Sequence, residues 1–116
     1  MKKFLVIGVF CCVLSACGVS TGEMRELNAK TYHFSKSANN VKQCLLDKLS
    51  DFGPDRMLIN DLGEHSEIFI GATQAGKFRS FYLFDISSNE IKLSHNDGVF
   101  PALSEREANE YIRFCL

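Results

Sequence analysis

The chain lacks the patterns that mark several large classes of protein. It has no block of basic residues, because its 13 lysines and arginines are interspersed with 14 acidic residues. This distribution excludes the basic patch by which proteins bind nucleic acid or an anionic lipid surface. Internal repeats and low-complexity segments are also absent. The longest apolar run, at positions 4–13, covers about ten residues and is too short to span a membrane comfortably.

Signals for catalysis are equally sparse. The sequence has no glycine-rich phosphate loop and no serine in a G-x-S-x-G turn. Glu64 and Glu67 lie near a predicted turn, so we expect their carboxylates to be exposed rather than poised for acid–base chemistry. We therefore expect a protein that is no enzyme and uses no cofactor.

The histidines leave a metal site as an alternative. If the ends of two predicted strands met, His65, His95 and Asp97 could together bind a metal ion. Their spacing resembles no Cys/His zinc pattern, and His33 has no such neighbours. Histidines in turns are commonly just solvated, so we expect no metal site.

The N-terminus has the pattern of an export signal. Lys2 and Lys3 precede the apolar run, as in a signal peptide. The run is followed by Leu14-Ser15-Ala16-Cys17, an apolar residue, two small residues and a cysteine. This tetrapeptide resembles the lipobox of bacterial lipoproteins. The resemblance implies that residues 1–16 are a signal peptide cleaved after Ala16, and that Cys17 is the site of lipidation by acyl chains such as palmitate.

Two alternatives to lipidation stay open for the N-terminal cysteines. One is an ordinary secretory signal in which Cys17 occurs by chance. The second is a metal site that includes Cys11 and Cys12, which would place thiolates inside an apolar helix without the spacing of zinc ligands. Under the lipoprotein interpretation, Cys11 and Cys12 leave with the signal peptide.

The resemblance also implies a location in the cell envelope. Two or three acyl chains make membrane anchoring stable, whereas a single chain holds only marginally. An Asp after the lipidated cysteine resembles the inner-membrane retention signal, but here that residue is Gly18. We therefore expect an outer-membrane protein facing the periplasm in a Gram-negative cell. In a Gram-positive cell the same anchor would place it on the outer face of the plasma membrane.

The two remaining cysteines predict a disulfide. Cys44 lies on the apolar stripe of a helix predicted over 38–51, and Cys115 lies on that of a C-terminal helix. The second helix begins with a capping box of Ser104 and Glu107. Because exported domains are oxidised and small ones gain from a cross-link, we expect a Cys44–Cys115 bond. The alternative is a pair of reduced, buried cysteines.

Four short apolar runs between the helices predict β-strands, at positions 56–61, 66–72, 78–86 and 90–95. Their connections are too short for crossover helices, so neighbouring strands should be antiparallel. We expect residues 17–36 to be the lipidated cysteine and a flexible tether, and residues 37–116 to form one small α+β domain. In this domain, a four-stranded antiparallel meander is flanked in sequence by two helices that pack on one face and are joined by the disulfide. The layout, with "VKQCL" early and "ANEYIRFCL" at the end, loosely resembles small exported bacterial proteins of unknown function and implies no activity.

One face of the third predicted strand is a candidate partner surface, made of Arg79, Phe81, Leu83 and Asp85. If both helices cover the other face of the sheet, these side chains form an exposed apolar patch rimmed by charge, which typically marks a protein partner. The alternative is that the N-terminal segment, with Tyr32 and Phe34, folds over this patch.

Two functional classes fit these expectations. The first is a membrane-anchored binding or accessory module for a protein partner in the envelope, whose identity the sequence does not reveal. The second is an inhibitor, immunity or phage-exclusion lipoprotein that antagonises an envelope-acting partner.

Overall fold

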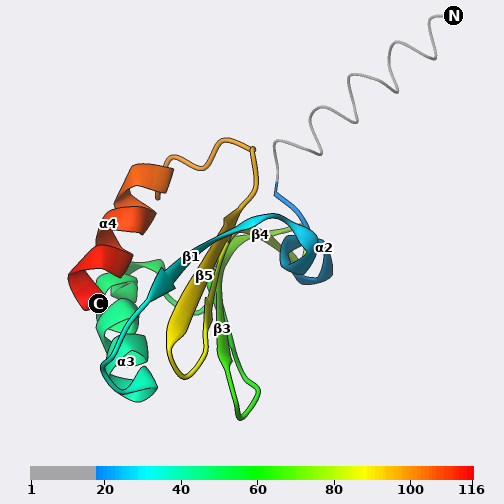
Figure 1. Ribbon diagram of the computed structural model, residues 1–116. Helices are drawn as coiled ribbons and strands as arrows, with labels where there is room; N and C mark the ends of the chain where they lie inside the picture. Colours follow the sequence, from blue (N-terminus) through cyan, green and yellow to red (C-terminus); the bar gives the residue numbers. More distant parts are fainter. Residues whose placement is uncertain (1–17) are drawn as a thin grey trace, which may run out of the picture.

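A computed structural model describes residues 18–116, which form a five-stranded antiparallel sheet with helices on both faces (Figure 1). The elements in chain order are α2 (Thr21–Glu26), β1 (Ala29–His33), α3 (Ala38–Lys48), the 3₁₀ helix η1 (Ser50–Phe52), β2 (Met57–Asp61), β3 (Ser66–Gln74), β4 (Lys77–Ile86), β5 (Glu90–His95) and α4 (Glu105–Cys115). The strand order across the sheet is β1-β5-β4-β3-β2. The predicted signal peptide and Cys17 lie outside the described residues.

The α+β class and the antiparallel meander are confirmed. Strands β2, β3, β4 and β5 pair consecutively, each antiparallel to the next. The β3–β4 hairpin turns at Ala75 and Gly76, which both have positive φ angles of 50° and 77°. Two consecutive left-handed residues match the twist of the flanking strands and make a tight hairpin.

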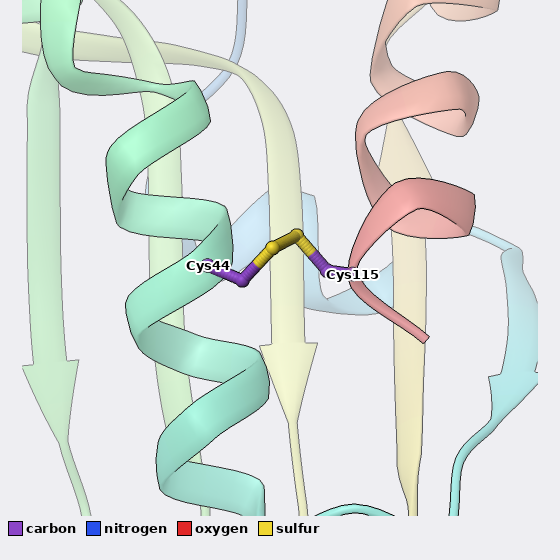
Figure 2. Close-up of a disulfide and its surroundings, with 2 residues drawn as sticks. All are labelled: Cys44 and Cys115. Carbon is purple, nitrogen blue, oxygen red and sulfur yellow. A yellow bond between two sulfur atoms is a disulfide. The ribbon is translucent and has the colours of Figure 1, made fainter.

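Helices α3 and α4 pack side by side on one face of the sheet, as predicted (Figure 1). The disulfide between them is also present: the Cα atoms of Cys44 and Cys115 are 5.6 Å apart, across 71 positions of sequence (Figure 2). The predicted capping box of α4 forms, with Ser104 and Glu107 bonding to each other's backbone N–H groups. The buried residues of this helix-side core include Val41, Leu45, Leu49, Ile68, Ile70, Phe84, Ile91, Leu93, Ala108 and Ile112.

A fifth strand corrects the predicted four-stranded sheet. β1 pairs antiparallel with β5, with Tyr32 opposite Ile91. The Tyr32 hydroxyl donates a hydrogen bond to Asn109 of α4, and Phe34 packs against the helix-side core. The segment predicted to be a flexible tether thus contains both β1 and α2, so the fold already includes residues that precede position 37.

The second face of the sheet is covered at its centre by α2. Met24 of this helix is fully buried against Phe69 and Leu83. Leu83 is only 4% exposed, so the prediction of an open apolar patch is wrong. The covering segment is residues 19–27, and not the part around Tyr32 and Phe34.

Phe81 is also buried, at 3% exposure, but in the opposite core. The β3–β4 register shifts between Ile70 and Gly71, so that Ile70 pairs with Tyr82 while Gly71 pairs with Ser80. Phe81 is the extra residue of this β-bulge, which interrupts the alternation of side chains between faces. Its ring stacks on Phe100 with the ring centroids 4.6 Å apart.

Candidate functional site

A line of polar side chains crosses the part of the second sheet face that lies beside α2. It runs in register over all five strands and consists of Asn60, Glu67, Asp85, Lys92 and Thr31. We call this set the polar row. The neighbouring register line contains Phe69 and Leu83, which α2 covers. One half of this face is therefore closed by apolar packing, and the other half is polar and partly open.

Glu67 is the buried member of the polar row, with 2% of its surface exposed. Its two carboxylate oxygens each accept a hydrogen bond from Arg25 of α2, and both bonds are 2.8 Å long. Asn60 adds a longer bond of 3.4 Å. The expectation that Glu67 is exposed is therefore wrong, because α2 brings a guanidinium over the carboxylate.

The Arg25 pairing also sets the charge state of Glu67. Hydrogen bonding from Arg25 holds the pKa of the Glu67 carboxyl below its usual range, although burial acts in the opposite direction. The same hydrogen bond raises the pKa of Arg25. The Arg25 guanidinium also lies 5.5 Å from the centre of the Phe69 ring, so both charges are held in a fixed, satisfied geometry. This pair fastens α2 to the sheet and is not poised for chemistry.

His65 and Asp85 form the accessible polar pair of the site. The Nδ1 atom of His65, just before β3, lies 2.8 Å from a carboxylate oxygen of Asp85 on β4. Both side chains are partly exposed. Lys92 sits opposite Asp85 on β5 and is exposed. These three residues offer a hydrogen-bonding imidazole, a carboxylate and an ammonium group on one surface.

Three hollows border His65, and two of them are large. The first, of about 270 Å³, is lined by Arg25, Leu27, Ala29, His65, Glu67, Leu83, Asp85, Lys92 and Ser94. The second, of about 290 Å³, lies toward α3 and includes an ion pair between Lys42 and Asp61 with a separation of 2.6 Å. That bond from Lys42, with one from Ser66, lowers the pKa of Asp61. Because both hollows are shallow and mixed in polarity, they suit recognition of another polar surface.

The alternative metal site does not assemble. β3 and β5 are both antiparallel to β4 and so run in the same direction, which places His65 before one strand and His95 at the end of another, at opposite ends of the sheet. His95 contacts Glu105 at 2.6 Å instead. Within residues 18–116, no cluster of three or more His, Cys, Asp or Glu side chains is placed to bind a metal ion.

The geometry also differs from that of a catalytic triad. In the described part of the chain, His65 hydrogen-bonds to a carboxylate and to no hydroxyl or thiol group. A nucleophile within hydrogen-bond reach of the base is what such catalysis requires. The described contacts of His65 therefore do not form a Ser-His-Asp or Cys-His triad.

The structure places the residues of the predicted partner surface in different environments. Asp85 belongs to the polar row, whereas Phe81 and Leu83 are buried. Arg79 is partly buried, and its guanidinium donates to the carbonyl oxygen of Gly18 at 3.4 Å. The sequence reasoning missed Arg25 and Lys92, and it considered His65 as a metal ligand rather than as a partner of Asp85. Strand alternation could have placed Lys92 beside Asp85, but nothing local indicates that Arg25 reaches the sheet.

Comparison with known proteins gives no relative: no family model matches the chain, and neither a curated protein nor a solved structure is significantly similar to it. Among the helices of residues 18–116, none has the length and apolar character needed to cross a membrane.

Proposed function

We propose that this protein is a lipid-anchored bacterial envelope protein that acts as a small binding or accessory module, with Cys17 as the lipidated residue. The lipobox-like tetrapeptide Leu14-Ser15-Ala16-Cys17 supports the anchor. The Cys44–Cys115 bond supports export, because disulfides persist in oxidising compartments outside the cytosol. A Gram-negative host would carry the protein on its outer membrane, facing the periplasm.

The observation that carries the binding role is the position of the polar row. The chain next to the anchor pairs with β4 at Ser80, where Val19 forms an isolated bridge. Asp85 lies five residues further along the same strand, which corresponds to about 17 Å at roughly 3.3 Å per residue. The partly open polar surface is thus displaced from the anchor and available to another molecule.

A protein is the partner that this surface fits best. Its accessible groups carry both signs of charge, from Asp85 and Lys92, beside the imidazole of His65. Mixed charge and hydrogen-bonding groups around shallow hollows are typical of the polar parts of protein interfaces. A nucleic acid would instead require a continuous basic surface.

Photocrosslinking in cells tests the binding role. A photoreactive amino acid at Lys92 should crosslink a discrete envelope protein, whereas the same substitution at Lys36, an exposed lysine between β1 and α3, should not. Equal products from both positions would overturn the proposed surface. A crosslinked component of an envelope assembly would assign an accessory role, whereas a toxin, phage protein or envelope hydrolase would assign the antagonist role.

Metabolic labelling tests the anchor independently. Cys17→Ser should abolish incorporation of labelled palmitate and leave the protein either soluble or as an uncleaved precursor. Equal incorporation into the mutant and the native chain would contradict the lipobox interpretation. If the native chain carries no lipid but still gives the Lys92 crosslink, the binding role is retained and only the anchor is contradicted.

A further inference from the structure

The residue that follows Cys17 is fixed to the centre of the sheet. The carbonyl oxygen of Gly18 accepts a hydrogen bond from Arg79, and the next residue, Val19, exchanges two backbone hydrogen bonds with Ser80 at 3.0 and 2.7 Å. A Cβ atom at Gly18 would lie 2.9 Å from the Ser80 oxygen and 3.0 Å from the Phe81 ring. Cys17 is one peptide unit away, at about 3.8 Å between Cα atoms, so no flexible linker separates it from the fold.

The segment 96–104, which joins β5 to α4, lies beside this entry point. Its first residue, Asn96, donates a backbone hydrogen bond of 2.9 Å to Phe81, the residue against which Gly18 rests. Phe100 stacks on the same Phe81 ring. At the far end of the segment, the Leu103 carbonyl oxygen accepts a bond of 2.8 Å from Tyr82. The segment, drawn in orange, is therefore held at the same end of the domain as residue 18 (Figure 1).

Val99 projects from this segment into solvent. It is 76% exposed, the largest value among the exposed large apolar side chains of residues 18–116. Asp97 is the one charged residue between positions 96 and 104. An exposed valine on a nearly uncharged loop beside a lipid anchor has the character of a membrane-interface contact rather than of an electrostatic one.

We propose that this end of the domain rests on the bilayer that holds the Cys17 lipid, with Val99 inserted at the level of the lipid headgroups. The proposal rests on the lipid anchor proposed above. The polar headgroup region is roughly 5–8 Å thick on each side of the hydrocarbon core. A domain attached through a single peptide unit stays close to the headgroup layer. Val99 therefore encounters the lipid headgroups at high effective concentration.

A fixed orientation follows from this contact. The turns at 62–65 and 87–89 lie at the end of the sheet opposite to segment 96–104 (Figure 1). His65 and Asp85 are near those turns, so they face away from the membrane. The same geometry that brings Val99 to the lipid therefore presents the polar row to a partner in the aqueous compartment.

Fluorescence depth measurement tests the proposal. The lipidated protein, purified from membranes, would carry Val99→Cys labelled with the environment-sensitive fluorophore NBD, because Cys44 and Cys115 are bonded to each other. The control is Leu62→Cys, which is 51% exposed at the opposite end. On phosphatidylcholine vesicles, the Val99 label should shift to shorter emission wavelength and be quenched by spin labels on the lipid. The Leu62 label should show neither change.

Each outcome decides between the proposals. A Val99 label that behaves like the Leu62 label, on protein that floats with the vesicles, overturns the membrane contact but not the anchor. Protein that carries no lipid and does not float overturns both. Adding phosphatidylglycerol or salt should leave the Val99 signal unchanged, since the contact is apolar; a signal that needs anionic lipid would contradict this mode of contact.

Discussion

The carboxylate of Glu67 accepts two hydrogen bonds from the guanidinium of Arg25, across 42 positions of sequence. The pair holds a short helix of six residues on the sheet. A helix of this length is not stable in isolation, so its position depends on contacts with the rest of the fold. Those contacts are the Arg25 pair and the fully buried Met24.

Removing Arg25 should therefore destabilise the domain. Arg25→Ala leaves the buried Glu67 carboxylate without its main partner, and we expect a loss of about 2–3 kcal/mol, since Arg25 itself is half-exposed. Urea unfolding monitored by circular dichroism measures this change. The control is Glu26→Ala, an exposed neighbour in α2 that should alter stability by less than about 0.5 kcal/mol. Equal effects of both substitutions would contradict the assigned role of the pair.

The same pair predicts how stability depends on pH. The pKa of Glu67 in the folded protein lies below the usual value of 4.5. Its stabilisation is therefore fully present above the unfolded pKa and is lost as the pH falls through the folded pKa. Unfolding curves recorded below about pH 4.5 should show that Glu67→Gln loses less stability on acidification than the native chain. A parallel decline in both proteins would show that other carboxylates dominate.

The disulfide predicts that substituting either of its two cysteines lowers the free energy of unfolding by a similar amount. Closing a loop of 71 positions contributes roughly 4 kcal/mol in the chain-entropy treatment. Cys44→Ala and Cys115→Ala should each lose most of this amount, and the double mutant should be little worse, because one link is lost in every case. Alkylation of the unfolded, non-reduced mature protein should label neither cysteine. Labelling of both in protein taken from the envelope would show that the bond is absent there.

We predict that position 71 must be glycine, because β3 and β4 approach each other closely at the bulge. An added Cβ atom would lie 1.9 Å from the backbone oxygen of Arg79, which cannot rotate away. Gly71→Ala should cost on the order of 1–3 kcal/mol or prevent folding. The matched control is Gly22→Ala in α2, where no atom lies within 4 Å of the added carbon. That variant should be neutral or slightly stabilised in the same unfolding assay.

Membrane fractionation tests the expected location. In a Gram-negative cell the protein should accompany outer-membrane markers, because Gly18 rather than Asp follows Cys17. Recovery with inner-membrane markers alone would contradict this expectation. Gly18→Asp is expected to disturb the fold as well as sorting, since Gly18 has a φ angle of 85° and has no room for a side chain. Its stability should therefore be measured alongside its location.

Local patterns predicted the parts of the fold that depend on them. The stripes that contain Cys44 and Cys115 are long enough to show helical periodicity, and Ser104 and Glu107 specify a helix start without help from the rest of the chain. The disulfide was then predicted from the expected oxidising compartment and from the presence of two cysteines besides those of the N-terminal segment. The meander was equally accessible, because its turns are short and its strands are rich in β-branched and aromatic residues.

The remainder depends on contacts between distant residues. Helix α2 has Met24 as its one buried residue, so no periodic stripe indicates it. In the sequence, Phe81 has the pattern of a regular strand residue. In the structure, the β-bulge next to Gly71 directs its side chain into the helix-side core. The pairing of Arg25 with Glu67 leaves no local signal in either segment. The same absence accounts for the wrong prediction that the buried carboxylate is exposed.

The distances in sequence between paired elements also bear on the order of folding. β1 pairs with β5, α2 packs on β4, and the partner of Cys44 lies 71 positions later in the chain. Nearly every N-terminal element thus awaits a partner that is translated much later. A chain synthesised from its N-terminus cannot complete this sheet or close this cross-link until β5 and α4 have been made. The edge strand β1 and the disulfide are therefore late additions to the fold, and α3 stays without its covalent link until α4 is available.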